Sequence, residues 1–174
     1  MIALVIGGSG SGKSAYAEHL LDGKTNKYYI ATMQVYDAEG EKKVARHRRL
    51  RAGKGFVTME QPRDIGEVDF SKRVQQAMEP PDRAGQNVTE RPCCALLECM
   101  SNLVANELYM EQGAGKDTVR SVIEGIRRLK EQSRNLVIVT NEVFSESVPD
   151  SVEMKNYKKV LGEINPVSYT HLRA

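Results

Sequence analysis

Short apolar runs alternate with longer, charged stretches along this chain, and the alternation predicts its secondary structure. Four apolar runs have the length and character of strands that are buried on both faces of a sheet. These runs are residues 2–6, 27–32, 94–99 and 135–140. The stretches between them predict helices at residues 14–21, 37–51, 101–110 and 118–132. Strands that alternate with helices predict an α/β fold, a mainly parallel sheet flanked by helices and joined by right-handed crossovers.

One long segment, residues 61–92, shows no such periodicity. Its second half reads EPPDRAGQNVTERP, with Pro, Gly and Asn at the density of turns, so we expect an exposed excursion whose role the sequence leaves open. The chain has 174 residues, 40% of them hydrophobic and 28% charged. This length and composition fit one globular domain with a core of its own.

The glycine-rich turn after the first apolar run carries the clearest chemistry. It matches the phosphate-binding pattern G-x-x-x-x-G-K-S, with a strand before it and a helix after it, as the pattern requires. Glycines let successive backbone N–H groups wrap an anion, the lysine reaches the β- and γ-phosphates, and the serine ligates magnesium. A glycine turn that merely joins a strand to a helix is the alternative interpretation. The residues of this phosphate loop are Gly7, Gly8, Ser9, Gly10, Ser11, Gly12, Lys13 and Ser14.

A phosphate loop also needs a carboxylate at the end of a nearby strand to hold the magnesium shell. Glu98 follows the apolar run CALL and fits that position, so Ser14 and Glu98 are the predicted Mg²⁺ residues. The alternative is a carboxylate that caps a helix starting near Ser101. The residues alone thus predict a magnesium-dependent enzyme or switch that uses a nucleoside triphosphate.

The charges and cysteines exclude several other classes of protein. The net charge of +2 predicts neither a nucleic-acid partner nor a membrane surface. Cys93, Cys94 and Cys99 are odd in number and clustered, which supports neither a disulfide framework nor a zinc site. We expect reduced, buried thiols in a cytoplasmic protein without a signal peptide.

Several segments besides the phosphate loop resemble one family, the bifunctional adenosylcobinamide kinase/adenosylcobinamide-phosphate guanylyltransferase of cobalamin biosynthesis. The resemblance runs from Met1 to about Asn165, and it implies a P-loop α/β fold and a homotrimer. It also implies two reactions: a nucleoside triphosphate (ATP or GTP) phosphorylates adenosylcobinamide, and GMP is then transferred from GTP to that phosphate. The segments that carry the resemblance are YIAT (29–32), HRRLR (47–51), LLECMSNLVANE (96–107) and TNEV (140–143).

The resemblance implies roles for individual residues. His47 is the histidine that becomes guanylylated, and Lys13 is the second catalytic residue. A neutral imidazole nitrogen attacks the α-phosphate, and neighbouring arginines neutralise the phosphate charge. Without the family, the basic run around His47 is interpreted as a solvated helix face or a nucleic-acid patch. Other residues implied to bind nucleotide are Ala31, Thr32, Met33, Arg48, Arg49, Leu50, Arg51 and Glu60, together with Glu98.

Two other functions stay open at this point. One is a stand-alone P-loop kinase of small molecules that never uses His47. The other is a truncated, inactive relative that binds nucleotide and acts only through assembly. A covalent GMP adduct, and nucleotide binding by the folded chain, distinguish the three hypotheses.

The last nine residues, PVSYTHLRA, depart from the family pattern. We therefore expect a domain at residues 1–165 and an atypical tail at 166–174 that is not native to the family. Pro166 is expected to break the C-terminal helix, so that this helix and the family's last strand are missing. The expected consequence is exposed apolar surface and a less stable or aggregation-prone product.

Overall fold

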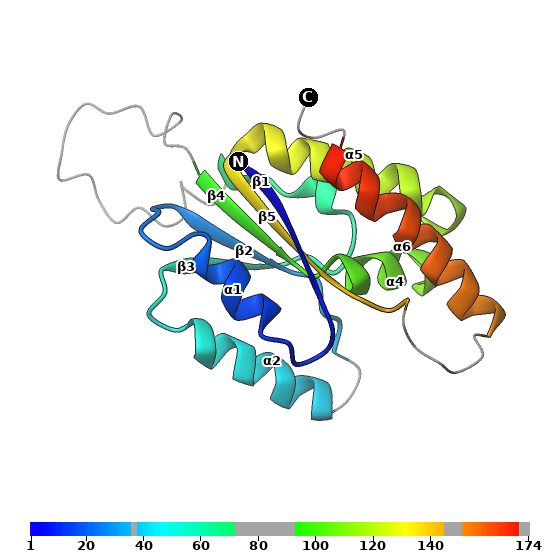
Figure 1. Ribbon diagram of the computed structural model, residues 1–174, viewed down its shortest axis with the longest axis horizontal. Helices are drawn as coiled ribbons and strands as arrows, with labels where there is room; N and C mark the ends of the chain where they lie inside the picture. Colours follow the sequence, from blue (N-terminus) through cyan, green and yellow to red (C-terminus); the bar gives the residue numbers. More distant parts are fainter. Residues whose placement is uncertain (36–37, 72–92, 145–150, 171–174) are drawn as a thin grey trace.

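One parallel sheet organises the computed structural model, which describes residues 1–35, 38–71, 93–144 and 151–170. The strand order is β1-β5-β4-β2-β3, and every neighbouring pair is parallel (Figure 1). The strands are β1 (Ile2–Gly7), β2 (Lys27–Ala31), β3 (Phe56–Glu60), β4 (Cys93–Glu98) and β5 (Ser133–Asn141).

Helices cover both faces of this sheet, and strand residues alternate between the two faces. Tyr28 and Leu97 pack in a larger core with the three helices α4, α5 and α6, whereas Tyr29 and Leu96 pack in a smaller core with α1. Figure 1 shows the two groups of helices apart from each other. The helices are α1 (Lys13–His19), α2 (Ala38–Arg51), α4 (Met100–Tyr109), α5 (Thr118–Gln132) and α6 (Val152–Thr170), with 3₁₀ turns η1 (Ile65–Glu67) and η3 (Gly115–Asp117).

The strand register brings distant parts of the sequence to one edge of the sheet. Gly7 lies beside Asn141, and Ala31 lies between Glu98 and Glu60. Because all strands run the same way, this edge holds their carboxyl ends, where open α/β sheets bind ligands.

The predicted fold class is confirmed by this architecture. The four predicted strands and four predicted helices are present, and α5 begins and ends at the predicted residues. β3 and η1 were not predicted. β3 is an edge strand whose residues are mostly half-buried or exposed, so its apolar signal is weak. The turn-like segment at residues 79–92 lies outside the described residues.

The prediction that Pro166 breaks the C-terminal helix is wrong. Helix α6 runs from Val152 to Thr170 with Pro166 inside it and packs on α4, α5 and β1. Leu161 and Ile164 are completely buried in the core. A proline removes one backbone donor near the end of a helix, and the burial of this face outweighs that loss. The C-terminal helix is therefore present; no strand follows it among the described residues.

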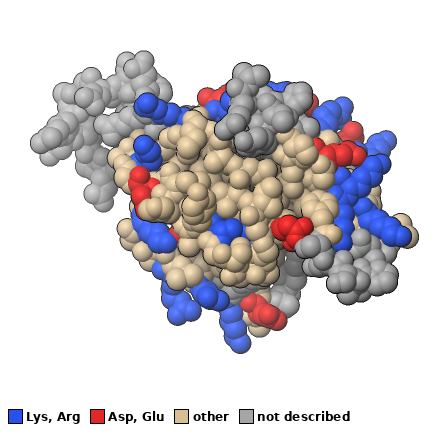
Figure 2. Space-filling view, viewed as in Figure 1, with Lys and Arg blue, Asp and Glu red and all other residues tan. Residues whose placement is uncertain are grey.

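Buried thiols and mixed surface charge agree with the sequence. Cys93, Cys94 and Cys99 are all free and buried. Figure 2 shows basic and acidic side chains interspersed on one face, most of them toward its margin, with mainly uncharged residues between them. Among the described helices, none has the length and apolar character needed to span a membrane.

Candidate active site

The phosphate loop is a tight turn between β1 and α1. Gly10 and Gly12 have φ angles of 72° and 81°, in the left-handed region that favours glycine. The Lys13 ammonium donates a hydrogen bond of 3.0 Å to the carbonyl of Gly8, so the lysine lies across its own loop. The loop residues 8–12 are exposed, and the lysine is thus placed at the mouth of an open backbone cradle.

Ser14 and Glu98, the two predicted Mg²⁺ residues, meet at the base of this loop. The Ser14 hydroxyl donates a hydrogen bond of 2.7 Å to Oε1 of Glu98. The other carboxylate oxygen, Oε2, is buried and has no hydrogen-bond partner among the described residues. Burial raises the pKa of Glu98, while the Ser14 hydrogen bond and the Lys13 charge act in the opposite direction.

The predicted residues after β2 have different surroundings. Ala31 and Met33 are half-buried, whereas Thr32 is completely buried. The Thr32 hydroxyl accepts a hydrogen bond from the backbone N–H of Cys99 and donates one to the carbonyl of Cys99, both at 2.8 Å. Thr32 therefore joins the end of β2 to the residue that follows Glu98.

Helix α2 brings the predicted histidine to the same edge of the sheet. His47 is half-buried, and the neighbouring Arg48 forms an ion pair with Glu60 at the end of β3. Arg49 and Leu50 are exposed. The Arg48–Glu60 pair thus connects two residues that the sequence assigned to the nucleotide site from separate segments.

Arg51 is buried, whereas the other arginines of α2 are exposed. It is only 7% exposed, and its guanidinium carbon is 3.6 Å from the centre of the Tyr29 ring. Its Nε has no hydrogen-bond partner among the described residues. The sequence assigned Arg51 to the nucleotide site with the other arginines, and the structure packs its guanidinium over Tyr29 of β2.

A second contact at this helix end was missed by the sequence reasoning. Glu18 of α1 is 6% exposed and accepts a hydrogen bond of 2.5 Å from Lys54, in the turn after α2. The two residues are far apart in the sequence and belong to different elements, so no local pattern indicates their pairing.

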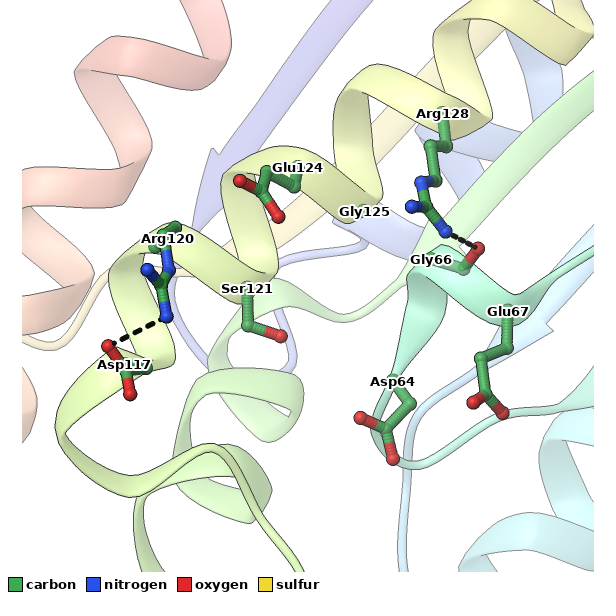
Figure 3. Close-up of a pocket in the computed structure, with 9 residues that line it drawn as sticks. All are labelled: Asp64, Gly66, Glu67, Asp117, Arg120, Ser121, Glu124, Gly125 and Arg128. Carbon is green, nitrogen blue, oxygen red and sulfur yellow. Dashed lines mark hydrogen bonds and ion pairs between the residues drawn. The ribbon is translucent and has the colours of Figure 1, made fainter.

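A hollow elsewhere on the surface contains none of the predicted site residues (Figure 3). It lies between η1 and α5, and its arginines are already engaged. Arg120 pairs with Asp117 at 3.1 Å, and Arg128 donates to the Gly66 carbonyl at 3.2 Å. The residues that line it are Asp64, Gly66, Glu67, Asp117, Arg120, Ser121, Glu124, Gly125 and Arg128.

Comparison with known families finds one match over nearly the whole chain. A family model described as "Cobinamide kinase / cobinamide phosphate guanyltransferase" matches residues 3–169. The matched range includes the first residues of the atypical tail.

Two curated proteins are similar to the chain at modest identity. The "Bifunctional adenosylcobalamin biosynthesis protein CobU" of Escherichia coli is 29% identical over 180 residues, covering 95% of this chain and 88% of that protein. The protein of the same name from Salmonella typhimurium is 27% identical over 179 residues, with the same coverage. Among solved structures, the "ATPase Domain of G40P" is similar with a TM-score of 0.47 and 12% identity, over 98% of this chain and 71% of that chain.

Proposed function

Because the chain belongs to the cobinamide kinase and cobinamide phosphate guanyltransferase family, we propose that it phosphorylates adenosylcobinamide and then transfers GMP from GTP to the product. One observation carries the proposal. The phosphate loop with Ser14 and Glu98, and the helix that bears His47, meet the same edge of one sheet. This arrangement supports phosphoryl transfer at the phosphate loop and guanylyl transfer at His47.

The kinase reaction uses the phosphate loop. The hydroxyl oxygen of adenosylcobinamide attacks the γ-phosphorus of a bound nucleoside triphosphate and loses its proton to solvent. The bond between the γ-phosphorus and the β,γ-bridging oxygen breaks, and the nucleoside diphosphate leaves. Lys13 leaves the Gly8 carbonyl to contact the phosphates, and the exposed N–H groups of the loop hold their oxygens.

Ser14 and Glu98 fit a magnesium ion by their donor chemistry. Both offer hard oxygen atoms, which Mg²⁺ prefers, and Oε2 of Glu98 is a buried acceptor without a partner among the described residues. Ser14 would ligate the ion directly and Glu98 would hold its shell, as in other phosphate-loop sites. When bound, the ion neutralises phosphate charge that develops during transfer.

The guanylyl transfer uses His47. A lone pair of its neutral imidazole attacks the α-phosphorus of GTP, the P–N bond forms, and pyrophosphate leaves with the electrons of the broken P–O bond. An oxygen of the phosphorylated acceptor then attacks the same phosphorus, the P–N bond breaks, and the imidazole regains its lone pair. Arg48 and Arg49, on the exposed side of α2, are the arginines that we assign to the phosphates.

The remaining nucleotide contacts follow from placement at the sheet edge. Ala31 and Met33 are half-buried there and supply backbone groups and apolar surface to GTP. Glu60 contributes through its ion pair with Arg48, and Leu50 through its exposed side chain. Thr32 acts from the interior, by holding the backbone of Cys99.

We place the protein in the cytoplasm as a homotrimer. The free thiols support a reducing compartment. The trimer is inferred from the family resemblance, and light scattering on the purified chain measures it directly.

Product analysis tests the proposed function. The chain is incubated with adenosylcobinamide, Mg²⁺ and either ATP or GTP, and the corrinoid products are followed by mass spectrometry. We expect the phosphate first and the GDP-linked corrinoid second, and the latter only when GTP is present. Phosphate without the GDP-linked product indicates a stand-alone kinase. A folded, nucleotide-binding chain that forms neither product indicates an inactive relative.

A further inference from the structure

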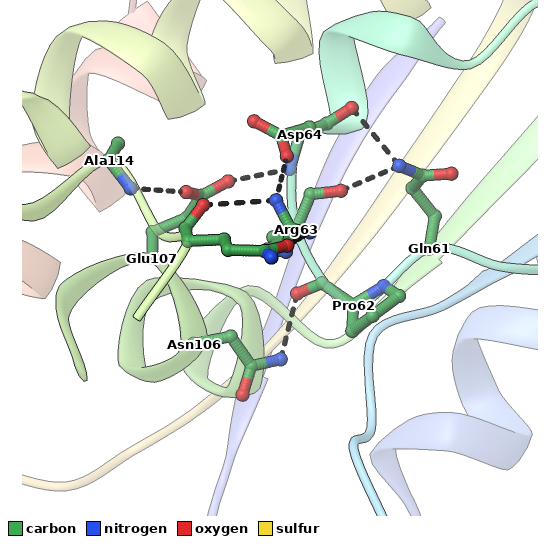
Figure 4. A network of polar contacts seen from close by, with 8 residues as sticks. Gln61, Pro62, Arg63, Asp64, Asn106, Glu107 and Ala114 are labelled. Carbon is green, nitrogen blue, oxygen red and sulfur yellow. Dashed lines mark hydrogen bonds and ion pairs between the residues drawn. The ribbon is translucent and has the colours of Figure 1, made fainter. Parts of the chain in front are cut away.

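The side-chain amide of Asn106 bridges two segments that leave the sheet at its carboxyl edge. Asn106 lies on α4 and is 7% exposed. Its Nδ2 donates to the carbonyl of Thr32 at 2.8 Å and to the carbonyl of Pro62 at 2.7 Å. Figure 4 shows the second of these bonds. Both amide hydrogens are therefore committed to backbone carbonyls.

These two bonds extend the sheet beyond its last backbone contact. The N–H of Gln61 donates to the carbonyl of Ala31 at 2.9 Å, which ties the ends of β3 and β2 together. One residue farther along, both segments continue as loops. There the Asn106 amide takes the place of a further backbone hydrogen bond between them. The amide thereby sets the distance between the loop after β2 and the loop after β3.

The next residue of α4 holds the same loop at a second point. Glu107 is 1% exposed, and its carboxylate accepts hydrogen bonds from the backbone N–H groups of Asp64 at 2.7 Å and Ala114 at 2.9 Å (Figure 4). The loop after β3 is thus clamped to α4 by two consecutive buried side chains.

Each loop held by Asn106 leads to a different part of the proposed active site. Thr32 bonds to the backbone of Cys99, which directly follows Glu98. Pro62 follows Glu60 by two residues, and Glu60 pairs with Arg48 beside His47. Asn106 therefore joins the segment that leads to Glu98 and the segment that leads to the helix bearing His47.

We propose that Asn106 is a positioning residue for the guanylylation of His47, an inference that rests on the proposed function. The buried amide donates both of its hydrogens to backbone carbonyls; it fixes the backbone that places Glu60, and through Glu60 the helix of His47, relative to Glu98. Displacing reacting groups by about 1 Å costs up to about 100-fold in rate, so a clamp of this kind affects catalysis from a distance.

The test replaces Asn106 by Asp, which keeps the size of the side chain but replaces the amide donor with an acceptor oxygen, and separately by Ala. The rate of covalent labelling by GTP that carries a labelled α-phosphate is measured in single turnovers over a range of GTP concentrations. We expect the maximal labelling rate to fall at least about tenfold in both variants. We expect the GTP concentration for half-maximal labelling to change much less, because the amide hydrogens of Asn106 bind backbone carbonyls.

Gln132→Ala is the matched control. Gln132 is also an amide clamp: it donates to the Val68 carbonyl at 2.8 Å and accepts from the Phe70 N–H at 3.1 Å, at the opposite end of the sheet. We expect Gln132→Ala to loosen the segment at Val68 and Phe70 about as much as Asn106→Ala loosens its loops, and to leave the labelling rate unchanged. Thermal unfolding of every variant confirms that the folded chain is being compared.

The outcomes separate this inference from the proposed function. A wild-type chain that takes no label overturns the proposed function and the role of Asn106 with it. If the wild-type chain is labelled and both Asn106 variants are labelled at the maximal rate of the wild type, the role of Asn106 alone is overturned. Equal slowing by the Asn106 variants and by Gln132→Ala also overturns it, since a general loss of packing then accounts for the effect.

Discussion

The Ser14 hydroxyl donates a hydrogen bond of 2.7 Å to the Glu98 carboxylate, across 84 positions of sequence. The contact joins the first turn of α1 to the end of β4 and leaves the second carboxylate oxygen buried without a partner among the described residues. A buried carboxylate oxygen without a hydrogen-bond partner lowers stability, and such unpaired polar atoms are typical of ligand-binding sites.

Replacing Glu98 by Gln tests the magnesium role of this carboxylate. The amide keeps an oxygen that accepts from Ser14 but removes the negative charge, so the phosphoryl-transfer rate at low Mg²⁺ should fall about 10–100-fold. The measurement is the kinase rate as a function of Mg²⁺ concentration. Glu67→Gln, at an exposed carboxylate of η1, is the control and should behave as the wild type. An unchanged Mg²⁺ requirement in Glu98→Gln contradicts the assignment.

Arg51 should prove to be an anchor of α2 and not a ligand of phosphate. Its guanidinium is buried against the Tyr29 ring, so Arg51→Ala should lower the free energy of unfolding by about 2 kcal/mol. Arg49→Ala, at an exposed position of the same helix, should change it by less than about 0.5 kcal/mol. Urea unfolding measures both variants. A stable Arg51→Ala protein with a weakened affinity for GTP is the opposite result and makes Arg51 a nucleotide ligand.

Tyr157 should give a pH-dependent contribution to stability. Its hydroxyl donates to the Ser101 carbonyl at 3.2 Å, linking α6 to α4, and burial raises the pKa of Tyr157 to about 12 from 10.0. A raised pKa means that the stabilisation is complete below pH 10 and is lost as the pH rises through about 12. Because it removes this hydrogen bond, Tyr157→Phe should lower the free energy of unfolding by about 1 kcal/mol at neutral pH.

Denaturant unfolding of the wild type and Tyr157→Phe over a pH series measures this difference. The gap between the two proteins should stay constant from about pH 7 to 10 and narrow above pH 10. A difference in unfolding free energy that stays constant up to about pH 12 shows that the phenol ionises equally in the folded and unfolded chain and is not buried as described.

The sequence predicted those features that depend on local pattern. The phosphate loop is a contiguous motif, and helix α5 shows a clear apolar face with Val122, Ile126 and Leu129 buried as one stripe. The position of Glu98 beside the phosphate loop could be predicted, because the end of a buried strand of a phosphate-loop fold lies near that loop. These features are encoded within short windows of residues.

Other features depend on contacts between distant segments and could not be predicted from the sequence. The burial of Arg51 against Tyr29 depends on how α2 crosses the sheet, and nothing in the run of arginines distinguishes it from its neighbours. Asn106 lies on a helix face with Asn102, but only the fold shows which carbonyls its amide reaches. Pro166 lies inside a helix despite its low helix propensity, because the tertiary burial of Leu161 and Ile164 outweighs that local preference.

The most direct test of the proposed function is a covalent label on one histidine. The chain is incubated with Mg²⁺ and GTP that carries a labelled α-phosphate, and the protein is separated by denaturing electrophoresis. Wild type, His47→Ala and His19→Ala are compared; His19 is an exposed histidine of α1 paired with Asp22 at 2.6 Å and serves as the control. We predict an acid-labile, base-stable label on the wild type and on His19→Ala, and none on His47→Ala. An unlabelled wild-type chain that is folded and binds GTP, or a His47→Ala chain that keeps its label, contradicts the account.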